Sequence, residues 1–234
     1  MTTWARGATA LATSIDAVVF DMDGVLLDSE PVWNGVRDDF ARAHGGRWTE
    51  EDQRALMGAN SAQWVAYMRD HCGVELPHDE IFAGVMRALR EWYAQDLPLF
   101  PGAREAVCAI APHYRLGLAS SSPRELIEYA LQLAELRGCF AVVVSSDEVA
   151  RGKPEPDVYR EACARLGASA QRSAAVEDSA NGILAAARAG LAVVAIPNPV
   201  FAPSTEALGC ADVVLASIAE LTVEVIGSLR CEPT

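Results

Sequence analysis

Four short polar clusters contain the side chains best suited to chemistry, and each cluster follows a run of apolar residues. The clusters are Asp21/Asp23 after AVVF, Ser120, Ser121 and Ser122 after LGLA, Lys153 shortly after VVVSSDEVA, and Glu177/Asp178 after SAAV. If these side chains converge, several carboxylates share a small volume, and they cannot all stay ionised without a cation. Such a set predicts a site for a hard divalent metal ion with oxygen ligands, beside which a phosphate is also attracted.

The apolar runs before the clusters have the length of buried strands, and the segments between them have helical spacing. The predicted strands are Ala17–Phe20, Arg115–Ala119, Ala141–Val144, Ala174–Val176, Ala192–Ile196 and Asp212–Leu215, and the predicted helices cover about 103–111, 123–136, 157–166 and 182–189. Strands that alternate with helices predict an α/β fold with a doubly wound, Rossmann-like parallel sheet. Ligands bind outside the carboxyl ends of such strands, so we expect the four clusters to converge there.

The segment that follows the first predicted strand has a different pattern. Trp33, Val36 and Phe40 recur at helical spacing, and no strand pattern appears before Pro98. The N-terminal stretch is rich in Ala and Thr and lacks the features of a signal peptide. The predicted organisation is a disordered extension at 1–14, an α/β core domain at 15–30 and 97–234, and an inserted helical domain at 31–96.

The composition of the 234-residue chain, 51% hydrophobic and 22% charged, is typical of a globular enzyme or binding protein. The formal net charge of −13 opposes binding to nucleic acid or to an anionic membrane, and no apolar run approaches the roughly 20 residues of a membrane span. Six cysteines and four histidines are scattered without the spacing of a zinc site or a disulfide scaffold. We therefore expect reduced cysteines and a cytoplasmic protein that binds neither nucleic acid nor membrane.

Each cluster also has a simpler structural explanation when it is considered alone. Asp-x-Asp-Gly can begin a calcium loop, but the fifth position is Val25 and no helix precedes it, which leaves a solvated turn as the alternative. Lys153 alone could be an ordinary surface lysine. The stretch Ser122–Glu125 has the pattern of a capping box with proline at the first helical position, which predicts an anion site at a helix N-terminus. Asp178 or Ser179 is expected to cap the next helix.

Four ordered motifs resemble those of the haloacid dehalogenase superfamily, in its phosphatase and phosphomutase branch with a helical cap after the first motif. The motifs are DMDGVLLDSE (21–30), LASSS (118–122), GKPEPD (152–157) and VEDSANG (176–182). The resemblance extends from about residue 16 to 222 and implies that the inserted helical domain is the cap. It further implies a phosphomonoester enzyme, because the dehalogenases and phosphonatases of the superfamily lack an aspartate at the place of Asp23.

The resemblance implies a catalytic role for each of the first three clusters. Asp21 would be the nucleophile that forms an aspartyl phosphate, and Asp23 would be the general acid and then the general base. Ser120, Ser121 and Lys153 would bind the transferring phosphate.

The same resemblance implies Mg²⁺ as the cofactor. Asp21, Asp178 and the backbone carbonyl of Asp23 would bind the ion, with Glu177 nearby through water. The metal ion and Lys153 would together neutralise the charge that develops on the transferred oxygens.

The segment DSEPVW (28–33) resembles that of phosphatases that act on hexose and polyol phosphates. The expected activity is therefore Mg²⁺-dependent hydrolysis of a small phosphorylated metabolite, a sugar or polyol phosphate. In the cap, Trp33, Gly58 and Asn60 are expected to contact the substrate. The expected assembly is a monomer or a weak homodimer.

Two alternatives stay open at this point, a β-phosphoglucomutase-like phosphomutase and a non-catalytic binding protein with the same fold. These mutases have an arginine just after a Leu-x-Gly of the cap, where this chain has Ser61, and a histidine where it has Trp33. Either Arg54 or Arg69 could supply the missing cation. Without such a cation, net hydrolysis is favoured over transfer to a second position of the sugar.

Overall fold

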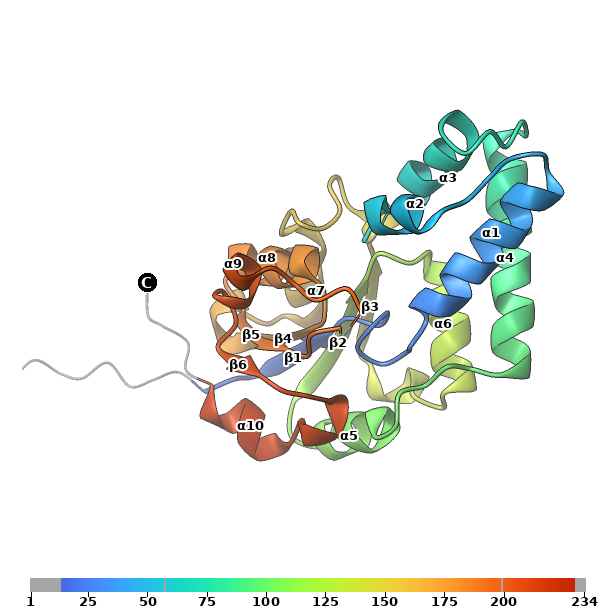
Figure 1. Cartoon of the computed structure of the whole chain (residues 1–234). Coiled ribbons are helices and arrows are strands. Elements are labelled where there is room, and N and C mark those ends of the chain that lie inside the picture. Colours follow the sequence, from blue (N-terminus) through green and yellow to red (C-terminus); the bar gives the residue numbers. More distant parts are fainter. Residues whose placement is uncertain (1–13, 57, 199, 230–234) are drawn as a thin grey trace, which may run out of the picture.

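The computed structural model describes residues 14–56, 58–198 and 200–229, so nearly all of the expected extension at residues 1–14 lies outside the described residues. The described residues contain a six-stranded parallel sheet in the order β3-β2-β1-β4-β5-β6 (Figure 1). The strands are β1 Ala17–Phe20, β2 Arg115–Ser120, β3 Val142–Ser145, β4 Ser173–Glu177, β5 Ala192–Ala195 and β6 Val213–Val214. The predicted α/β fold with a doubly wound, Rossmann-like sheet is confirmed.

Different helices cover the two faces of the sheet, because side chains alternate between the faces along each strand. In β1, Val18 and Phe20 belong to one hydrophobic cluster, whereas Ala17 and Val19 belong to the other. The first cluster includes side chains of α5 Ala103–Ile110, α6 Arg124–Leu133 and α10 Val223–Ser228, and the second those of α7 Asp157–Leu166, α8 Ala180–Ala189 and α9 Thr205–Leu208. The strand order reverses between β1 and β4, which is the point where ligands bind in such sheets.

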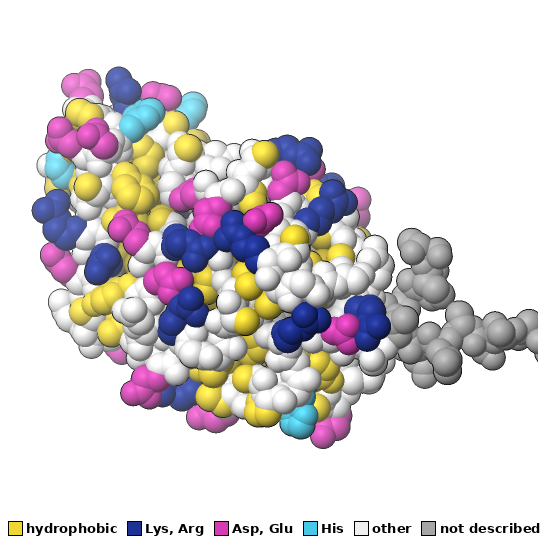
Figure 2. Space-filling model, turned by 180° about the vertical axis from the view of Figure 1, so that it is seen from behind, with side chains coloured by type: hydrophobic (Ala, Val, Ile, Leu, Met, Phe, Trp, Pro, Cys, Tyr) yellow, Lys and Arg dark blue, Asp and Glu magenta, His cyan; other side chains and the backbone are white. Residues whose placement is uncertain are grey.

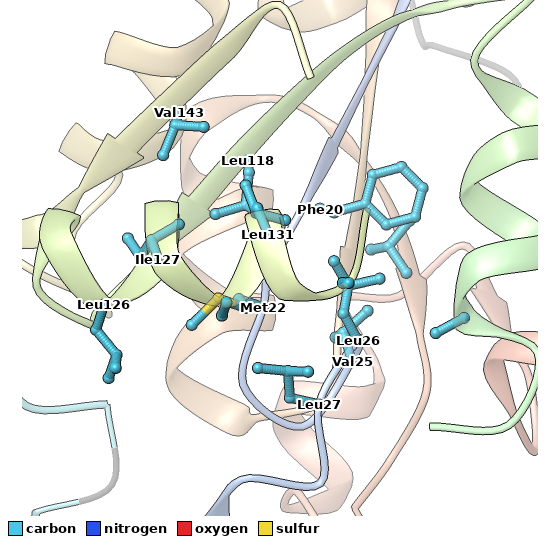
Figure 3. Close-up of a cluster of buried hydrophobic side chains, with 14 of the residues drawn as sticks. Phe20, Met22, Val25, Leu26, Leu27, Leu118, Leu126, Ile127, Leu131 and Val143 are labelled. Atoms are coloured by element: carbon cyan, nitrogen blue, oxygen red, sulfur yellow. The ribbon is translucent and has the colours of Figure 1, made fainter. Parts of the chain in front are cut away.

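Apolar side chains hold the turn after β1 against the sheet. The apolar residues between positions 22 and 27 are at most 2% exposed, and they lie near Phe20 and the apolar side of α6 (Figure 3). Burial of each such side chain contributes roughly 1.5–3 kcal/mol relative to its exposure to water. The backbone N–H groups of Leu26 and Leu27 donate to the carbonyl of Met22, which closes the turn. The loop that contains Asp21 and Asp23 is therefore fixed from the core side.

The segment between β1 and α5 is helical, as predicted, and consists of α1 Glu30–Ala43, α2 Glu50–Ala55, α3 Ser61–Asp70 and α4 His78–Gln95. Figure 1 shows these four helices together on one side of the sheet. Their apolar side chains join the same hydrophobic cluster as one face of the sheet, and α4 packs on α6. The division into a core domain at 15–30 and 97–234 and a cap at 31–96 stays a prediction.

The ends of the helices differ in detail from the predictions. The prediction of a capping box at Ser122–Glu125 is wrong, because Pro123 is the N-cap residue of α6 and no side chain caps that helix. The Ser122 hydroxyl is not available as a cap, since it donates to Asp23 instead. At α8 the prediction holds, since Ser179 is the N-cap residue and its hydroxyl accepts a backbone hydrogen bond from the first turn. The short helices α9 and α10 have no predicted counterpart, because so few turns show no clear periodicity.

Charged side chains of both signs are mixed on the surface. Figure 2 shows basic side chains beside acidic ones on the face that it presents. Several arginines are paired, as in Arg165 with Glu148 at 2.8 Å and Arg151 with Asp157 at 3.0 Å. Exposed pairs of this kind contribute only about 0–1 kcal/mol to stability. Among the helices of the described ranges, none has both the length and the apolar character needed to span a bilayer.

Candidate active site

Adjacent parallel strands bring the polar clusters to one edge of the sheet. Asp21 directly follows β1, Ser120 ends β2 and Glu177 ends β4. Since β1 pairs with both β2 and β4, the three strand ends lie side by side. Lys153, from the loop before α7, reaches the same place, with its Nζ 2.9 Å from Oδ1 of Asp21. The structure thus brings together side chains that are as many as 156 positions apart in the sequence.

Lys153 is buried and fully engaged by acceptors. Its Nζ donates to Oδ1 of Asp21 at 2.9 Å, to Oε1 of Glu177 at 2.6 Å and to the carbonyl of Ala119 at 3.1 Å. The Tyr159 hydroxyl donates to the same Glu177 oxygen at 2.5 Å. Burial lowers the pKa of Lys153, but the carboxylates of Asp21 and Glu177 outweigh this and raise it above its usual value. The ammonium therefore stays charged in the protein interior.

Three buried carboxylates surround the point where a metal ion is expected. Oxygens of Asp21, Glu177 and Asp178 all lie within 4.8 Å of one another. Burial raises the pKa of Asp21 to about 8, although Lys153 lowers it. Burial and then repulsion from Glu177 and Asp21 also raise the pKa of Asp178. A divalent cation with a preference for carboxylate oxygens would offset this unfavourable clustering, so the donor set fits Mg²⁺.

Two glycines allow the carboxylates to approach the backbone this closely. Gly24 has a φ of +83°, and a Cβ at that position would lie 2.0 Å from Oδ2 of Asp178. A Cβ at Gly182 would lie 2.0 Å from the carboxylate oxygens of Glu177. Any larger residue at Gly24 would therefore displace Asp178 and strain the turn. Both glycines lie within the motifs, but no role was predicted for them.

Three hydroxyls hold the carboxylate of Asp23. Its Oδ1 accepts from Ser29 at 2.6 Å, and its Oδ2 accepts from Ser122 at 2.7 Å and from Ser120 at 3.2 Å. These bonds fix the direction of the carboxyl group, which lines the cavity described below. No role was predicted for Ser29, and Ser122 was predicted only as a member of the serine cluster at a helix N-terminus, not as a partner of Asp23. The signal for Ser29 in the sequence is that it lies inside the motif DMDGVLLDSE, and Ser122 lies inside LASSS at the end of a predicted strand.

The two serines that were predicted to bind phosphate occupy different places. Ser120 is completely buried and its hydroxyl contacts Asp23. Ser121 lines the cavity, and its hydroxyl has no hydrogen-bond partner among the described residues. Of the two hydroxyls, that of Ser121 is therefore the one available to a ligand.

A cavity of about 60 Å³ lies between this cluster and the helices α1–α3. Its sheet end is lined by Asp21, Asp23, Ser121, Ser122, Lys153, Asp178 and Ser179, and its cap end by Glu30, Trp33, Arg37, Leu56, Gly58, Ala59 and Trp64. Two of the cap residues expected to contact the substrate, Trp33 and Gly58, thus lie at the cavity. Asn60 does not line it, because its side-chain oxygen caps α3 by accepting from the backbone of Gln63.

Sequence reasoning missed two charged residues of the cap end, Glu30 and Arg37. The available signal was position, since Arg37 comes four residues after Trp33 on α1 and so lies on the buried side of that helix. A charged residue at a position where the periodicity predicts an apolar one is a candidate for function.

A hydrogen-bonded contact joins the start of α3 to the loop after β3. The backbone N–H and the hydroxyl of Ser61 donate to the carboxylate of Asp147 at 2.9 Å and 2.5 Å. Ligand pockets usually measure roughly 300 Å³ or more, so a cavity of about 60 Å³ is too small for a phosphorylated sugar.

Comparisons with known proteins agree with this geometry. The family described as haloacid dehalogenase-like hydrolase matches residues 15–190. The chain is 32% identical over 212 residues to Hexitol phosphatase B of Escherichia coli (strain K12), which covers 89% of this chain and 95% of that protein. It is 31% identical over 179 residues to the phosphorylated carbohydrates phosphatase of Thermotoga maritima, which covers 76% and 82% of the two chains. Among solved structures, CbbY from Rhodobacter sphaeroides in complex with phosphate matches with a TM-score of 0.81 and 28% identity, over 92% of this chain and 100% of that one.

Proposed function

Since the chain belongs to the haloacid dehalogenase-like hydrolases, we propose that it is a phosphatase that hydrolyses a small phosphorylated metabolite, a sugar or polyol phosphate. The observation that most directly supports this proposal is the contact between Asp21 and Lys153, at 2.9 Å, inside a cluster of three carboxylates. A carboxylate can attack a phosphoryl group only when cations offset the negative charge of both. A buried carboxylate that is paired with a charged lysine meets part of this need.

The reaction proceeds in two steps. In the first step, an oxygen of Asp21 attacks phosphorus, the bond to the leaving oxygen breaks, and an aspartyl phosphate forms. Asp23 gives its proton to the leaving alkoxide, and the hydroxyls of Ser29 and Ser122 hold it in place for this transfer. In the second step, Asp23 takes a proton from water as the water attacks the aspartyl phosphate, which releases phosphate and restores Asp21.

Cations at the sheet end balance the charge on the phosphoryl oxygens. Lys153 contributes its ammonium, and the hydroxyl of Ser121 is available as a further donor. Mg²⁺ would be held by Asp21, Asp178 and the backbone carbonyl of Asp23, with Glu177 behind them. When bound, the ion supplies positive charge that stabilises the transition state.

A carbohydrate body for the substrate is supported by the relatives and by the cavity. Two of the curated relatives are named Hexitol phosphatase B and phosphorylated carbohydrates phosphatase. The cap end of the cavity combines the aromatic side chains Trp33 and Trp64 with polar ones. Indole faces pack against the C–H groups of a sugar or polyol, while polar groups bind its hydroxyls.

Hydrolysis is favoured over phosphomutase activity by the residues at and near the position where the mutases have a cap arginine. Ser61, in place of the mutase arginine, is engaged with Asp147. Arg54 is exposed and paired with Glu50, and neither Arg54 nor Arg69 lines the cavity. A bisphosphate intermediate would therefore lack the cationic contact that either arginine could have supplied.

The test is release of inorganic phosphate from sorbitol 6-phosphate, β-glucose 1-phosphate and p-nitrophenyl phosphate, each with Mg²⁺, with Ca²⁺ and with a chelator. We expect turnover with Mg²⁺, little with Ca²⁺ because its coordination is larger and looser, and none with the chelator. No hydrolysis of any phosphomonoester with Mg²⁺ would mean a non-catalytic protein. In ³¹P NMR, glucose 6-phosphate that appears from β-glucose 1-phosphate faster than inorganic phosphate would mean a mutase.

A further inference from the structure

The cap end of the cavity contains a buried cation that lacks a close carboxylate. Arg37 on α1 is 5% exposed and lines the cavity. In the described part of the chain, no acidic oxygen lies within 4.0 Å of its nitrogens, its one side-chain hydrogen bond goes to Oε1 of Gln53 at 3.4 Å, and its Nε has no partner. Buried charges are normally paired or bound to a ligand, so this guanidinium has donor capacity that the protein does not use.

Three tryptophans surround the guanidinium without replacing the missing acceptor. Its central carbon lies 4.4 Å from the ring centre of Trp33, 5.5 Å from that of Trp64 and 5.6 Å from that of Trp48. Such contacts stabilise the cation by about 0.5–2 kcal/mol each, and they hold the guanidinium in one orientation. Burial still outweighs the attraction of Glu30 and Asp23 and lowers the pKa of Arg37 to about 10. The side chain is therefore held rigidly in a position that is costly for the protein alone.

An amide links this cation to a carboxylate at the same end of the cavity. Gln53, which is buried on α2, donates from Nε2 to Oε2 of Glu30 at 2.5 Å and accepts from Arg37 at 3.4 Å. Glu30 and Arg37 both line the cavity. The amide therefore orients an acceptor and a donor on the wall that faces the catalytic carboxylates.

The charges of this group favour a neutral ligand over an anionic one. Glu30 and Arg37 carry opposite charges, so together they add no net charge to the cap end. A second phosphate or a carboxylate bound by Arg37 would also lie close to Glu30, which would repel it. A hydroxyl group suits both residues, because it can donate to the carboxylate and accept from the guanidinium.

We propose that Glu30, Gln53 and Arg37 form a hydroxyl-binding subsite that selects phosphomonoesters whose body is a neutral polyol or sugar. This inference rests on the proposed phosphatase function. It names the residues that recognise the sugar or polyol body of the substrate, which departs as the leaving group. Glu30 accepts from one hydroxyl of the substrate, and Nε and the terminal nitrogens of Arg37 donate to another. Gln53 is a positioning residue, since it acts through the other two.

The experiment compares kcat/KM for three substrates with related six-carbon bodies. Sorbitol 6-phosphate has hydroxyls, n-hexyl phosphate has none, and 6-phosphogluconate ends in a carboxylate. In Arg37→Met, which keeps an unbranched buried side chain, we expect the preference for sorbitol 6-phosphate over n-hexyl phosphate to fall by about 10- to 100-fold, as for the loss of a hydrogen bond to a charged group. Arg42→Met, on the exposed side of the same helix, is the matched control and should leave the preference unchanged.

A second variant keeps the test independent of the stability of the first. Glu30→Gln keeps the shape but removes the charged acceptor, and it should lower the same preference by about tenfold or more. Equal losses on sorbitol 6-phosphate and n-hexyl phosphate in both variants would show a general structural role and would overturn the subsite. A wild-type preference for 6-phosphogluconate over sorbitol 6-phosphate that disappears in Arg37→Met would also overturn it, in favour of an anion site.

The outcomes separate this inference from the proposed function. If the wild-type protein hydrolyses none of the three substrates, nor p-nitrophenyl phosphate, the proposed function has failed. If it hydrolyses them but the variants do not change the preference between them, only the subsite has failed.

Discussion

The two ends of the cavity hold their buried cations in different ways. Lys153, at the sheet end, has three acceptors within 3.1 Å, two of which are carboxylates. Arg37, at the cap end, has one neutral acceptor at 3.4 Å and is otherwise surrounded by indole rings. Both cations are almost completely shielded from solvent, so burial does not explain the difference. The protein itself supplies the partners of Lys153, whereas part of the binding capacity of Arg37 is left for a ligand.

Under the proposed function, this difference corresponds to what each end of the cavity would bind. A phosphoryl group is the same in every phosphomonoester, so fixed charges at the sheet end can be oriented for it in advance. The body of the substrate differs from one metabolite to another, and a site for it has to offer unused donors and acceptors. Changes at the sheet end should therefore affect all substrates, and changes at the cap end should depend on the substrate.

The largest effect is expected for Asp21→Asn. An amide of the same shape is a far poorer nucleophile, so kcat should fall by at least about 10³-fold on every substrate, including n-hexyl phosphate and p-nitrophenyl phosphate. The measurement is phosphate release under single-turnover conditions, with circular dichroism to establish that the fold is intact. If the purified variant keeps more than a few per cent of wild-type activity, Asp21 is not the nucleophile.

A large but substrate-dependent effect is expected for Asp23→Asn. Loss of general acid catalysis typically costs about 10²–10⁴-fold, and it should affect an alkyl phosphate far more than p-nitrophenyl phosphate, whose leaving group needs no proton. The measurement is kcat/KM for sorbitol 6-phosphate and p-nitrophenyl phosphate in both proteins. Ser29→Ala should lower kcat/KM for both substrates in the same pattern but by a smaller factor, since two hydroxyls still hold Asp23. Equal losses on both substrates in Asp23→Asn would contradict the acid role.

The smallest effect concerns stability rather than rate. It measures how much folding stability is lost by burying the Asp21 carboxylate at the sheet end of the cavity. Burial raises the pKa of Asp21 to about 8, against about 3.9 in an unfolded chain, so the folded protein binds this proton more tightly. Ionised Asp21 therefore destabilises the metal-free fold progressively from about pH 4 upward, and fully above about pH 8. Asp21→Asn removes this penalty and should raise Tm by several degrees at pH 8 and by almost nothing at pH 4.

The measurement is thermal unfolding in chelator at a series of pH values, with Asp39→Asn as the control at an exposed carboxylate. A lower Tm at pH 8 for Asp21→Asn would mean that its ion pair with Lys153 stabilises the protein more than burial of the carboxylate costs. In that case the buried carboxylate of Asp21 would not lower the stability of the fold.

The fold and the sheet end of the site could be predicted from the sequence because both depend on local patterns. Short apolar runs and helical spacing identified the six strands and the main helices, with boundaries within one to three residues. The ends of parallel strands meet at one edge, so motifs that follow strands converge whatever their distance in sequence. The order of strands and motifs along the chain is therefore enough to predict that Asp21, Lys153 and Asp178 lie together. The helix start at Ser122–Glu125 was misjudged, because the Asp23 carboxylate competes for the same hydroxyl.

The cap end was decided only by the tertiary structure. Its charged group joins Glu30 and Arg37 from α1 with Gln53 from α2, and no local pattern indicates that Gln53 faces the other two. The capping box of Asn60 and Gln63 at the start of α3 follows a local pattern, but no local pattern shows that Ser61, the next residue after Asn60, contacts the core. Periodicity reports which side of a helix is buried, but the packing angle between helices determines which buried residues meet. The convergence of side chains at the strand ends thus follows from the order of the motifs, whereas the group of Glu30, Gln53 and Arg37 depends on how α1 and α2 pack against each other.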